Sequence, residues 1–420
     1  MREMRESGIE WIGLIPAHWK TERLQWHITE IKETNKPEKS RQVLSLTNKR
    51  GVIPYEEKGA QGNVSKEDYS QYRLAYPGTI VANSMNILIG SVGRCDYFGC
   101  VSPVYYVYKP KDGENLEFIN YQFQMEQFQK ELRRYANGIL EIRLRVSSDG
   151  ILKREMAFPP LAEQMQIVSF LNAKLSHVER LIANVQTQIE KLKTYKQSVI
   201  TEVVTKGLDP TVPMKDSCVE WIGEIPAHWE IKRGKALFKE TEARSTDGSE
   251  ELLTVSQYTG ITPRSQKNVT MFEALSLEGY KICEIGDIAA NTMWLWAGAI
   301  GVSEYRGVIS PSYNVYRQRS DNFVPQYLDH LLRAPMLVQE YASLSTGIRA
   351  SRLRLYPKDF FNIMFPVPPI EEQQAILDAL SSKCSAVDRL IAIKQAKIEK
   401  LEQYKHSLIY EYVTGKREVV

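Results

Sequence analysis

The chain has 420 residues, of which 43% are hydrophobic and 25% charged, and its formal net charge is +3. This balance is typical of an ordinary soluble globular protein with two or three domains, and the mild basicity does not by itself indicate a nucleic-acid partner. The absence of any run of about 18 apolar residues excludes a membrane-spanning helix, and the charged N-terminus lacks the apolar core of a signal peptide. We therefore expect a cytoplasmic protein that does not associate with a membrane.

The first element in chain order is a short motif that occurs twice. Residues 10–19 read EWIGLIPAHW and residues 220–229 read EWIGEIPAHW, so nine of the ten positions are identical. The motif therefore marks a repeat of about half the chain. Two such repeats are too few, and each is too long, for a solenoid, and each half is long enough to bury its own core. The sequence therefore predicts a duplicated unit whose two halves are related by a pseudo-twofold axis.

Strand signals follow in both halves. Residues 78–108 align without gaps to residues 286–316, and both segments contain a glycine turn and short runs rich in β-branched residues and tyrosine. Such runs are typical of strands, whereas residues 117–135 and 324–344 have a helical pattern. Each half is therefore predicted to contain an α+β globular domain that is rich in strands.

A long helix is predicted after each globular part. Residues 162–205 contain neither proline nor glycine, and their apolar residues recur at alternating steps of four and three, which is the coiled-coil pattern. The same pattern returns in the second half, and it is interrupted at Lys196, Lys394 and Lys405. A narrow apolar seam on a helix of about 65 Å needs a partner, which we expect to be the other helix of the same chain, running antiparallel. The alternative is a coiled coil between two copies of the chain.

These patterns divide the chain into four predicted segments. Residues 1–158 and 212–367 would form two globular domains, and residues 159–211 and 368–420 would form two helical segments. A proline pair precedes each helix, where proline ends a strand and allows a helix to begin. Gly207 and Gly415 close the two helical patterns.

Between the shared positions the two copies differ. Residues 47–50 read Thr-Asn-Lys-Arg where the second copy has Ser-Gln-Tyr-Thr, and residues 86–89 read Asn-Ile-Leu-Ile where it has Trp-Leu-Trp-Ala. A scaffold that repeats while its loops differ fits two domains that read different targets. The alternative is sequence drift in unconstrained loops.

The order of these motifs resembles the specificity subunits of type I restriction–modification systems. The resemblance covers nearly the whole chain and rests most on the paired EWIG segments, on PPLAEQ with its partner PPIEEQ, and on GVISPSY at residues 307–313. The first copy departs modestly, with CVSPVY at residues 100–105. It also has Leu140 where the second copy has Arg349, so a phosphate contact there would pass to Arg143 or Arg145.

The resemblance implies a DNA sequence-specificity subunit that is not itself an enzyme. Each globular domain would be a target recognition domain for one half of an asymmetric, bipartite DNA site, and the helices would set the spacing between the halves. The repeated regions would dock two methyltransferase subunits, which carry S-adenosylmethionine, and restriction subunits would join that complex. The chain itself would bind double-stranded DNA and no cofactor.

The sequence contains no recognisable catalytic motif. There is no Asp/Asn-Pro-Pro-aromatic run for adenine methylation, no Gly-x-x-x-x-Gly-Lys-Ser/Thr loop and no Gly-x-Ser-x-Gly elbow. The five cysteines lack zinc-ligand spacing, which favours reduced and mostly buried thiols and no metal site. His18 and His228 stand beside tryptophans in duplicated positions, so a packing or capping role is favoured over catalysis.

Base recognition needs side chains that reach the edges of bases in the major groove, such as arginine or lysine for guanine and asparagine or glutamine for adenine. Phosphate contacts position a protein without reading the sequence. We expect base contacts in the first half from Thr47, Asn48, Lys49, Arg50, Asn86 and Arg94, and in the second half from Gln257, Tyr258, Arg264, Trp294 and Arg349. We expect phosphate contacts from Arg143, Arg145, Arg352 and Arg354.

Alternatives remain open for these residues and for the chain. Each side chain could be an ordinary solvated one, Trp294 and Trp296 could belong to the core, and the shared Asn83 and Asn291 fit a structural role in a turn better. The competing function is a coiled-coil adaptor scaffold that binds no DNA. Salt-dependent DNA affinity would discriminate between the two functions, because phosphate contacts release counterions.

Overall fold

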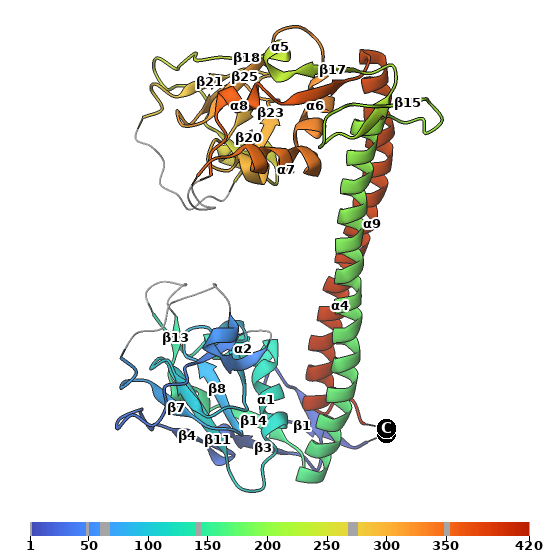
Figure 1. Ribbon diagram of the computed structural model, residues 1–420. Helices are drawn as coiled ribbons and strands as arrows, with labels where there is room; N and C mark the ends of the chain where they lie inside the picture. Colours follow the sequence, from blue (N-terminus) through green and yellow to red (C-terminus); the bar gives the residue numbers. More distant parts are fainter. Residues whose placement is uncertain are drawn as a thin grey trace. The chain divides into compact units, whose positions relative to one another are not determined.

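The computed structural model describes residues 2–47, 50–58, 68–138, 144–267, 276–347 and 353–419 (Figure 1). The chain forms two compact units: unit 1 comprises Met1–Gln186 with Ala396–Val420, and unit 2 comprises Thr187–Gln395. Each unit has its own main hydrophobic core. Unit 1 therefore combines the first part of the chain with its last residues.

Unit 1 is built on a four-stranded antiparallel sheet with the order β4-β11-β8-β9. In β8, Ile80 and Ala82 pack in the main hydrophobic core, whereas Val81 packs in a second hydrophobic cluster on the opposite face. The sheet is therefore covered on both faces. The remaining strands form the antiparallel pairs β1-β2, β3-β14, β5-β6, β7-β10 and β12-β13. The strands are β1 (Met4–Glu6), β2 (Leu14–Pro16), β3 (Lys20–Arg23), β4 (Ile28–Ile31), β5 (Leu44–Thr47), β6 (Gly51–Pro54), β7 (Arg73–Ala75), β8 (Thr79–Asn83), β9 (Val92–Cys95), β10 (Gly99–Val101), β11 (Tyr105–Pro110), β12 (Ala136–Asn137), β13 (Arg145–Val146) and β14 (Glu155–Phe158).

Unit 2 repeats this topology. Its four-stranded sheet has the order β18-β25-β22-β23, and the pairs β15-β16, β17-β26, β19-β20 and β21-β24 match those of unit 1 in chain order. A single bridge between Thr346 and Arg354 stands where unit 1 has β12-β13. The predicted duplication is thus confirmed at the level of strand pairing. The strands are β15 (Met214–Asp216), β16 (Glu224–Pro226), β17 (Glu230–Arg233), β18 (Phe238–Glu240), β19 (Leu253–Ser256), β20 (Gly260–Pro263), β21 (Lys281–Cys283), β22 (Ile288–Ala290), β23 (Ile300–Val302), β24 (Gly307–Ile309), β25 (Asn314–Gln318) and β26 (Met364–Val367).

Helices occur at equivalent places in both units. The two long ones, α4 (Leu161–Lys206) and α9 (Ile370–Val413), have 46 and 44 residues and agree closely with the predicted ranges. The short helices are α1 (Leu116–Gln124), α2 (Glu126–Arg133), α3 (Ser148–Leu152), α5 (Gly234–Leu237), α6 (Pro325–Leu332), α7 (Pro335–Leu344) and α8 (Pro357–Phe360). Single 3-10 turns are η1 (Leu24–Trp26), η2 (Tyr55–Lys58), η3 (Ile87–Ile89), η5 (Arg264–Gln266) and η6 (Leu295–Ala297).

Three predicted elements are each divided in the structure. The helical pattern of residues 324–344 forms α6 and α7, because Pro335 forces Ala334 into an extended conformation. The helical pattern of residues 117–135 is broken in the same way at Met125, which is extended and buried. Within residues 78–108, the β-branched and tyrosine-rich run at 101–108 is split by a turn in which Tyr105 N donates to Ser102 O at 2.9 Å, so β10 and β11 belong to different sheets.

In unit 1 the first part of α4 packs antiparallel against the last part of α9 (Figure 1). The rings of Phe170 and Tyr412 lie 4.5 Å apart, and Lys405 Nζ is 3.3 Å from Glu179 Oε1. A later residue of α4 thus contacts an earlier residue of α9, as expected for antiparallel helices. The buried seam residues of this stretch join the core of unit 1: Leu171, Leu175, Leu408 and Tyr412. The predicted antiparallel pairing within one chain is therefore found here.

The same pairing occurs within unit 2. Lys394 Nζ donates to Gln188 Oε1 at 2.6 Å, and Lys196 Nζ lies 2.7 Å from Asp388 Oδ2. Together with Lys405 in unit 1, every lysine that interrupts the apolar pattern bonds a side chain of the opposite helix. The seam is therefore interrupted where polar side chains reach across from one helix to the other.

The repeated motifs meet at one carboxylate in each unit. In unit 1, Glu163 Oε2 accepts a hydrogen bond from Trp19 Nε1 at 3.0 Å and lies 2.8 Å from His18 Nε2. In unit 2, Glu372 Oε2 makes the same contacts with Trp229 Nε1 at 2.9 Å and His228 Nε2 at 2.8 Å. The glutamate of PPxxEQ thus joins each long helix to the EWIG segment, and each histidine, although exposed, contacts the same carboxylate.

A glycine at the end of the opposite helix lies close to the proline and tryptophan of each EWIG segment. Gly415 follows α9 with φ +70°, and a Cβ there would lie 2.5 Å from Pro16 Cδ and 3.0 Å from the Trp19 ring. Gly207 follows α4 with φ +77°, and a Cβ there would lie 2.9 Å from Glu372 Oε1. Only glycine satisfies both the positive φ and the close approach. Each globular part is therefore held by the start of one long helix and the end of the other.

Candidate nucleic-acid interface

The β8-β9 hairpin is the platform on which the predicted base-reading segments of unit 1 meet. The turn that joins β5 to β6 lies against β9, because a Cβ on Gly93 would stand only 2.7 Å from the Cα of Gly51. Directly after β8, Ser84 O accepts a hydrogen bond from Val146 N of β13 at 3.0 Å. Two segments that are far apart in the sequence, the β5-β6 turn and β13, are thus brought to one hairpin.

The turn between β5 and β6 is fixed by its own first residue. Thr47 Oγ1 donates to Gly51 O at 3.1 Å and accepts from Arg50 N at 3.1 Å, so this hydroxyl holds the turn. The exposed Arg50 guanidinium pairs with Glu57 at 2.7 Å. An ion pair in solvent is worth at most about 1 kcal/mol, so Arg50 can exchange this partner for a base or a phosphate.

The loop between β8 and β9 depends on a shared asparagine. Asn83 is buried, and its Oδ1 accepts from Met85 N at 3.0 Å and from Asn86 N at 3.4 Å. Asn291 holds the equivalent loop through Met293 N at 3.2 Å. The structural role favoured for this shared asparagine is therefore present in both units. Asn86, in the same loop of unit 1, is exposed at the surface.

Arg94 extends from β9 beside the turn that carries Arg50. Its Nε lies 2.7 Å from Asp96 Oδ1, and its Nη1 is 3.7 Å from Glu117 Oε2. The side chain is about half exposed, at 47%. Like Arg50, it is held near a candidate surface by ion pairs that solvent weakens.

The candidate phosphate contacts lie at the base of two further loops. Arg145 faces Asn137 in the β12-β13 pair, and Arg354 bridges Thr346 at the equivalent place in unit 2. Both arginines are exposed. The remaining expected contacts lie outside the described residues: Asn48, Lys49, Arg143, Arg349 and Arg352.

Unit 2 presents a different surface on the same platform. The turn joining β19 to β20 approaches β23 closely, since a Cβ on Gly301 would lie 3.4 Å from the Cα of Gly260. Tyr258 at the tip is 81% exposed, and Gln257 beside it is half-buried. Arg264 is half-buried on η5, beyond β20. Where unit 1 offers the charged Arg50 on this turn, unit 2 offers an aromatic ring.

Two tryptophans occupy the loop that corresponds to Asn86 and its neighbours. Trp294 is 50% exposed and stacks on Trp296 with ring centroids 5.7 Å apart. Trp296 Nε1 donates to Met293 O at 2.9 Å, which anchors the pair to its own loop. The alternative that Trp294 belongs to the core is therefore wrong, because half of its side chain faces solvent.

Arg333, at the end of α6, was not expected from the sequence. Its Nη2 donates to the carbonyl of Tyr258 at 2.8 Å. Within the sequence it is one basic residue in a helical pattern, and only the fold brings it to a turn 75 residues earlier in the chain. No local signal could have predicted this contact.

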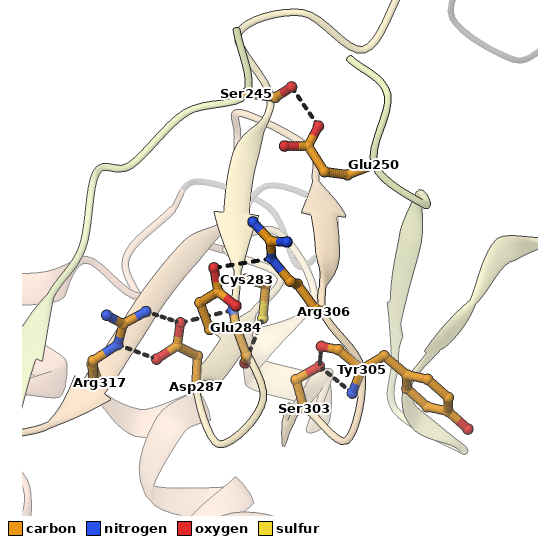
Figure 2. Close-up of polar contacts among 9 residues, drawn as sticks. All are labelled: Ser245, Glu250, Cys283, Glu284, Asp287, Ser303, Tyr305, Arg306 and Arg317. Atoms are coloured by element: carbon orange, nitrogen blue, oxygen red, sulfur yellow. Dashed lines mark hydrogen bonds and ion pairs between the residues drawn. The ribbon is translucent and has the colours of Figure 1, made fainter. Parts of the chain in front are cut away.

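Other arginines of unit 2 have structural partners. Figure 2 shows Arg317 on Asp287, with Nε to Oδ1 at 2.6 Å and Nη2 to Oδ2 at 2.7 Å, and Arg306 on Glu284 at 3.2 Å. The thiol of Cys283 lies in the same cluster, and burial raises its pKa to about 12, so it stays protonated at neutral pH. The Asp287–Arg317 pair joins the start of β22 to β25, the two inner strands of the sheet, and the buried thiol is not an activated nucleophile.

Among the described residues, no group of three or more histidine, cysteine, aspartate or glutamate side chains is arranged to hold a metal ion. No helix in the described ranges combines the length and apolar character needed to cross a bilayer.

Comparisons with known proteins agree with the repeated architecture. No protein-family model matches the chain. The chain is 25% identical over 441 residues to a protein of Methanocaldococcus jannaschii assigned as the type I restriction enzyme MjaX specificity subunit, an alignment that covers 96% of this chain and 95% of that protein. It is 27% identical over 276 residues to the type I restriction enzyme MjaVIII specificity subunit of the same organism, covering 62% of each chain.

A solved structure shares the fold. It comes from work on complex assembly and conformational transition of the type I R-M system, and it matches with a TM-score of 0.66 and 15% identity over 97% of this chain and 99% of that chain. The chain is therefore similar in sequence to a type I restriction enzyme specificity subunit over nearly its full length, and the solved structure shares its fold over nearly the whole chain.

Proposed function

We propose that this chain is the DNA sequence-specificity subunit of a type I restriction–modification complex. Each globular part reads one half of an asymmetric, bipartite site in double-stranded DNA. One observation carries the proposal: the same hairpin platform occurs in both units, yet the side chains exposed on it differ. Arg50, Asn86 and Arg94 occupy it in unit 1, and Tyr258 and Trp294 occupy it in unit 2. Identical halves would read identical sequences, whereas these halves present different chemistry.

The side chains on the two platforms fall into candidate base contacts, which would read the sequence, and candidate phosphate contacts, which would position the protein on DNA. Arginine can make two hydrogen bonds to guanine and asparagine two to adenine, while aromatic rings contact the thymine methyl group or stack on bases. Arg145 and Arg354 occupy equivalent, exposed places in the two units. A contact that is common to both halves suits the phosphate backbone, which has no sequence. We therefore assign these two to phosphates, together with Arg143 and Arg352.

The helical segments, residues 159–211 and 368–420, would set the spacing between half-sites and dock partner subunits. Large apolar side chains remain exposed along α4 and α9: Tyr195, Leu390, Ile393 and Tyr404. Exposed apolar side chains on a helix pair support a protein partner. Two methyltransferase subunits would dock there, and restriction subunits would join the complex. Catalysis would belong to these partners, with residues 1–158 and 212–367 as target recognition domains.

Salt-dependent DNA binding tests this function directly. The full chain with its methyltransferase subunits should bind a duplex library with random half-sites, and its affinity should fall steeply as salt rises from 50 to 200 mM (roughly the range over which phosphate contacts weaken). One split motif should be enriched. An adaptor scaffold would give neither a motif nor a salt-dependent affinity, and that result would overturn the proposal.

A further inference from the structure

We infer that Arg333 is a positioning residue for base recognition by unit 2. Its guanidinium, braced by Asp329, holds the main chain of the turn that carries Gln257 and Tyr258. The inference rests on the proposed function, because it names what fixes one of the two reading surfaces. It assigns no base contact to Arg333 itself.

The contacts run from the sheet to the tip of the turn. Asp329 Oδ1 accepts a hydrogen bond from Val302 N of β23 at 2.9 Å, and its Oδ2 lies 3.5 Å from Arg333 Nη1. Arg333 Nη2 then donates to Tyr258 O at 2.8 Å and to Gln257 O at 3.4 Å. Since these bonds use only main-chain carbonyls of the turn, the Gln257 and Tyr258 side chains remain available for DNA.

Two glycines make room for this arrangement. A Cβ on Gly301 would lie 2.9 Å from Asp329 Oδ1, and a Cβ on Gly260 would lie 3.3 Å from Arg333 Nη1. Gly260 also has φ +64°, a conformation that disfavours side chains. The turn, the strand and the Asp329–Arg333 pair therefore fit together as one packed group.

The exposed fractions of the two side chains differ between Arg333, which positions the turn, and Tyr258, which would contact DNA. The Arg333 side chain is 28% exposed, whereas Tyr258 is 81% exposed. A planar guanidinium with several fixed donors can bind two carbonyls and a carboxylate at once, which the single ammonium group of lysine cannot reproduce. An exposed turn with a large aromatic ring would otherwise lose entropy on binding DNA, so holding it in advance favours discrimination.

Unit 1 lacks this device. At the offset of 209 residues that relates α1 to α6, Gln124 stands in place of Arg333 and Asn120 in place of Asp329. The corresponding turn in unit 1 is held by the Thr47 hydroxyl instead. A change at Arg333 should therefore affect only the half-site that unit 2 reads, which makes the other half-site an internal control.

The test compares Arg333→Lys and Arg333→Met with the matched control pair Arg306→Lys and Arg306→Met. Arg306 is an arginine of the same unit whose side chain is 64% exposed and pairs with Glu284 at 3.2 Å. Each full chain is assembled with its methyltransferase subunits and used to select from a duplex library with random half-sites. Affinity for the selected duplex is then measured against salt concentration.

For the Arg333 variants, discrimination at one or more positions of the second half-site should fall at least about fivefold. The first half-site and the salt dependence should match those of the parent chain and the Arg306 variants. Unchanged discrimination would overturn the inference. A uniform loss of affinity with a shallower salt dependence would also overturn it, since that result marks a phosphate contact.

Two further outcomes are separable. If the Arg333 variants fail to fold, the Asp329→Asn variant tests the inference instead. It keeps an acceptor for Val302 N and removes the negative charge that pairs with Arg333. This variant should weaken second-half discrimination in the same direction, and unchanged discrimination would count against the inference. If the parent chain selects no split motif, the proposed function fails, whatever Arg333 does.

Discussion

Glu163 and Glu372 each contact a histidine and a tryptophan ring nitrogen of the EWIG segment. The Trp19 and Trp229 side chains that they bond are almost fully buried, so their Nε1 groups have no access to solvent. A buried donor without an acceptor loses its hydrogen bond to water and gains nothing in return. These carboxylates therefore matter for folding, which explains why the same residue types appear in both copies.

Replacing Glu163 by alanine should destabilise unit 1 by about 1–3 kcal/mol, because it leaves the Trp19 donor buried and unpaired. Urea denaturation followed by tryptophan fluorescence would measure this change. The control is Glu155→Ala, whose ion pair with Arg23 is 3.9 Å long and half exposed and should matter little. Equal effects of the two substitutions would contradict the structural role given to Glu163.

Replacing Arg50 by alanine should relax discrimination at one base pair of one half-site by about 1–3 kcal/mol if Arg50 reads guanine. The readout is selection from a duplex library, as above. Arg41→Ala is a suitable control, since Arg41 is an exposed arginine on the same segment that pairs with Glu38. A loss that is uniform across all sequences would instead show that Arg50 contacts a phosphate.

His330 gives unit 2 a pH-dependent stability. Burial lowers its pKa below the usual 6.5, and Arg333 and Lys196 lower it further, while Asp329 opposes them. Below pH 6.5 the unfolded chain takes up a proton that the folded unit binds less readily, so the free energy of unfolding falls as the pH falls. His330→Gln should therefore lose less stability than the parent between pH 7 and 5. Identical pH profiles in denaturation experiments would refute this role.

At the scale of elements, the long helices depend on their apolar seam more than on their ion pairs. Leu175 is buried in the core of unit 1, whereas the pair between Lys405 and Glu179 remains partly in solvent. We expect Leu175→Ala to cost about 2–5 kcal/mol and Lys405→Met to cost less than about 1 kcal/mol. Chemical denaturation of the full chain would compare the two. A larger effect of Lys405→Met would contradict this ranking.

The sequence was most informative where a pattern was long or repeated. The first long helix was predicted to within a residue at both ends and the second was located by the repeat, because many apolar positions agree on one period and glycine or proline marks the ends. The duplication was evident from nine identities in ten residues. Local signals failed where a buried residue or a proline interrupts a run, as at Met125 and at Ser102–Pro103.

The candidate interface was only partly predictable, for a physical reason. The divergent loops identified Arg50, Asn86, Tyr258 and Trp294, which are exposed on the hairpin platform. Contacts between segments far apart in the chain, such as Arg333 with the turn at Tyr258, depend on tertiary structure and leave no periodicity in the sequence. The base contacts themselves remain predictions.

At the scale of the whole molecule, the length of the helices should determine the spacing of the DNA halves. An insertion near Val204 would disturb the core of unit 2, because Val204 is fully buried there. Seven residues are better inserted in both helices, after Thr187 in α4 and after Gln395 in α9, so that the apolar seam keeps its heptad period. This lengthens each helix by about 10 Å, or about three base pairs of DNA.

The two half-site sequences should remain the same after this double insertion, while the gap between them grows. The selected or methylated motif gives the result. An insertion in only one helix is the control, and it should impair folding because the paired seam loses its register. A changed half-site sequence in the double insertion would contradict the role of the helices. The pseudo-twofold relation between the halves remains a prediction from the repeat.

The most direct test of the central claim is the methylation pattern of DNA in cells that express this chain with its methyltransferase subunits. Single-molecule sequencing of that DNA should show methylation at one split, asymmetric motif, and the motif should disappear when this chain is omitted. Methylation that does not depend on the chain, or the absence of both a motif and a co-purifying methyltransferase, would contradict the account and favour an adaptor scaffold.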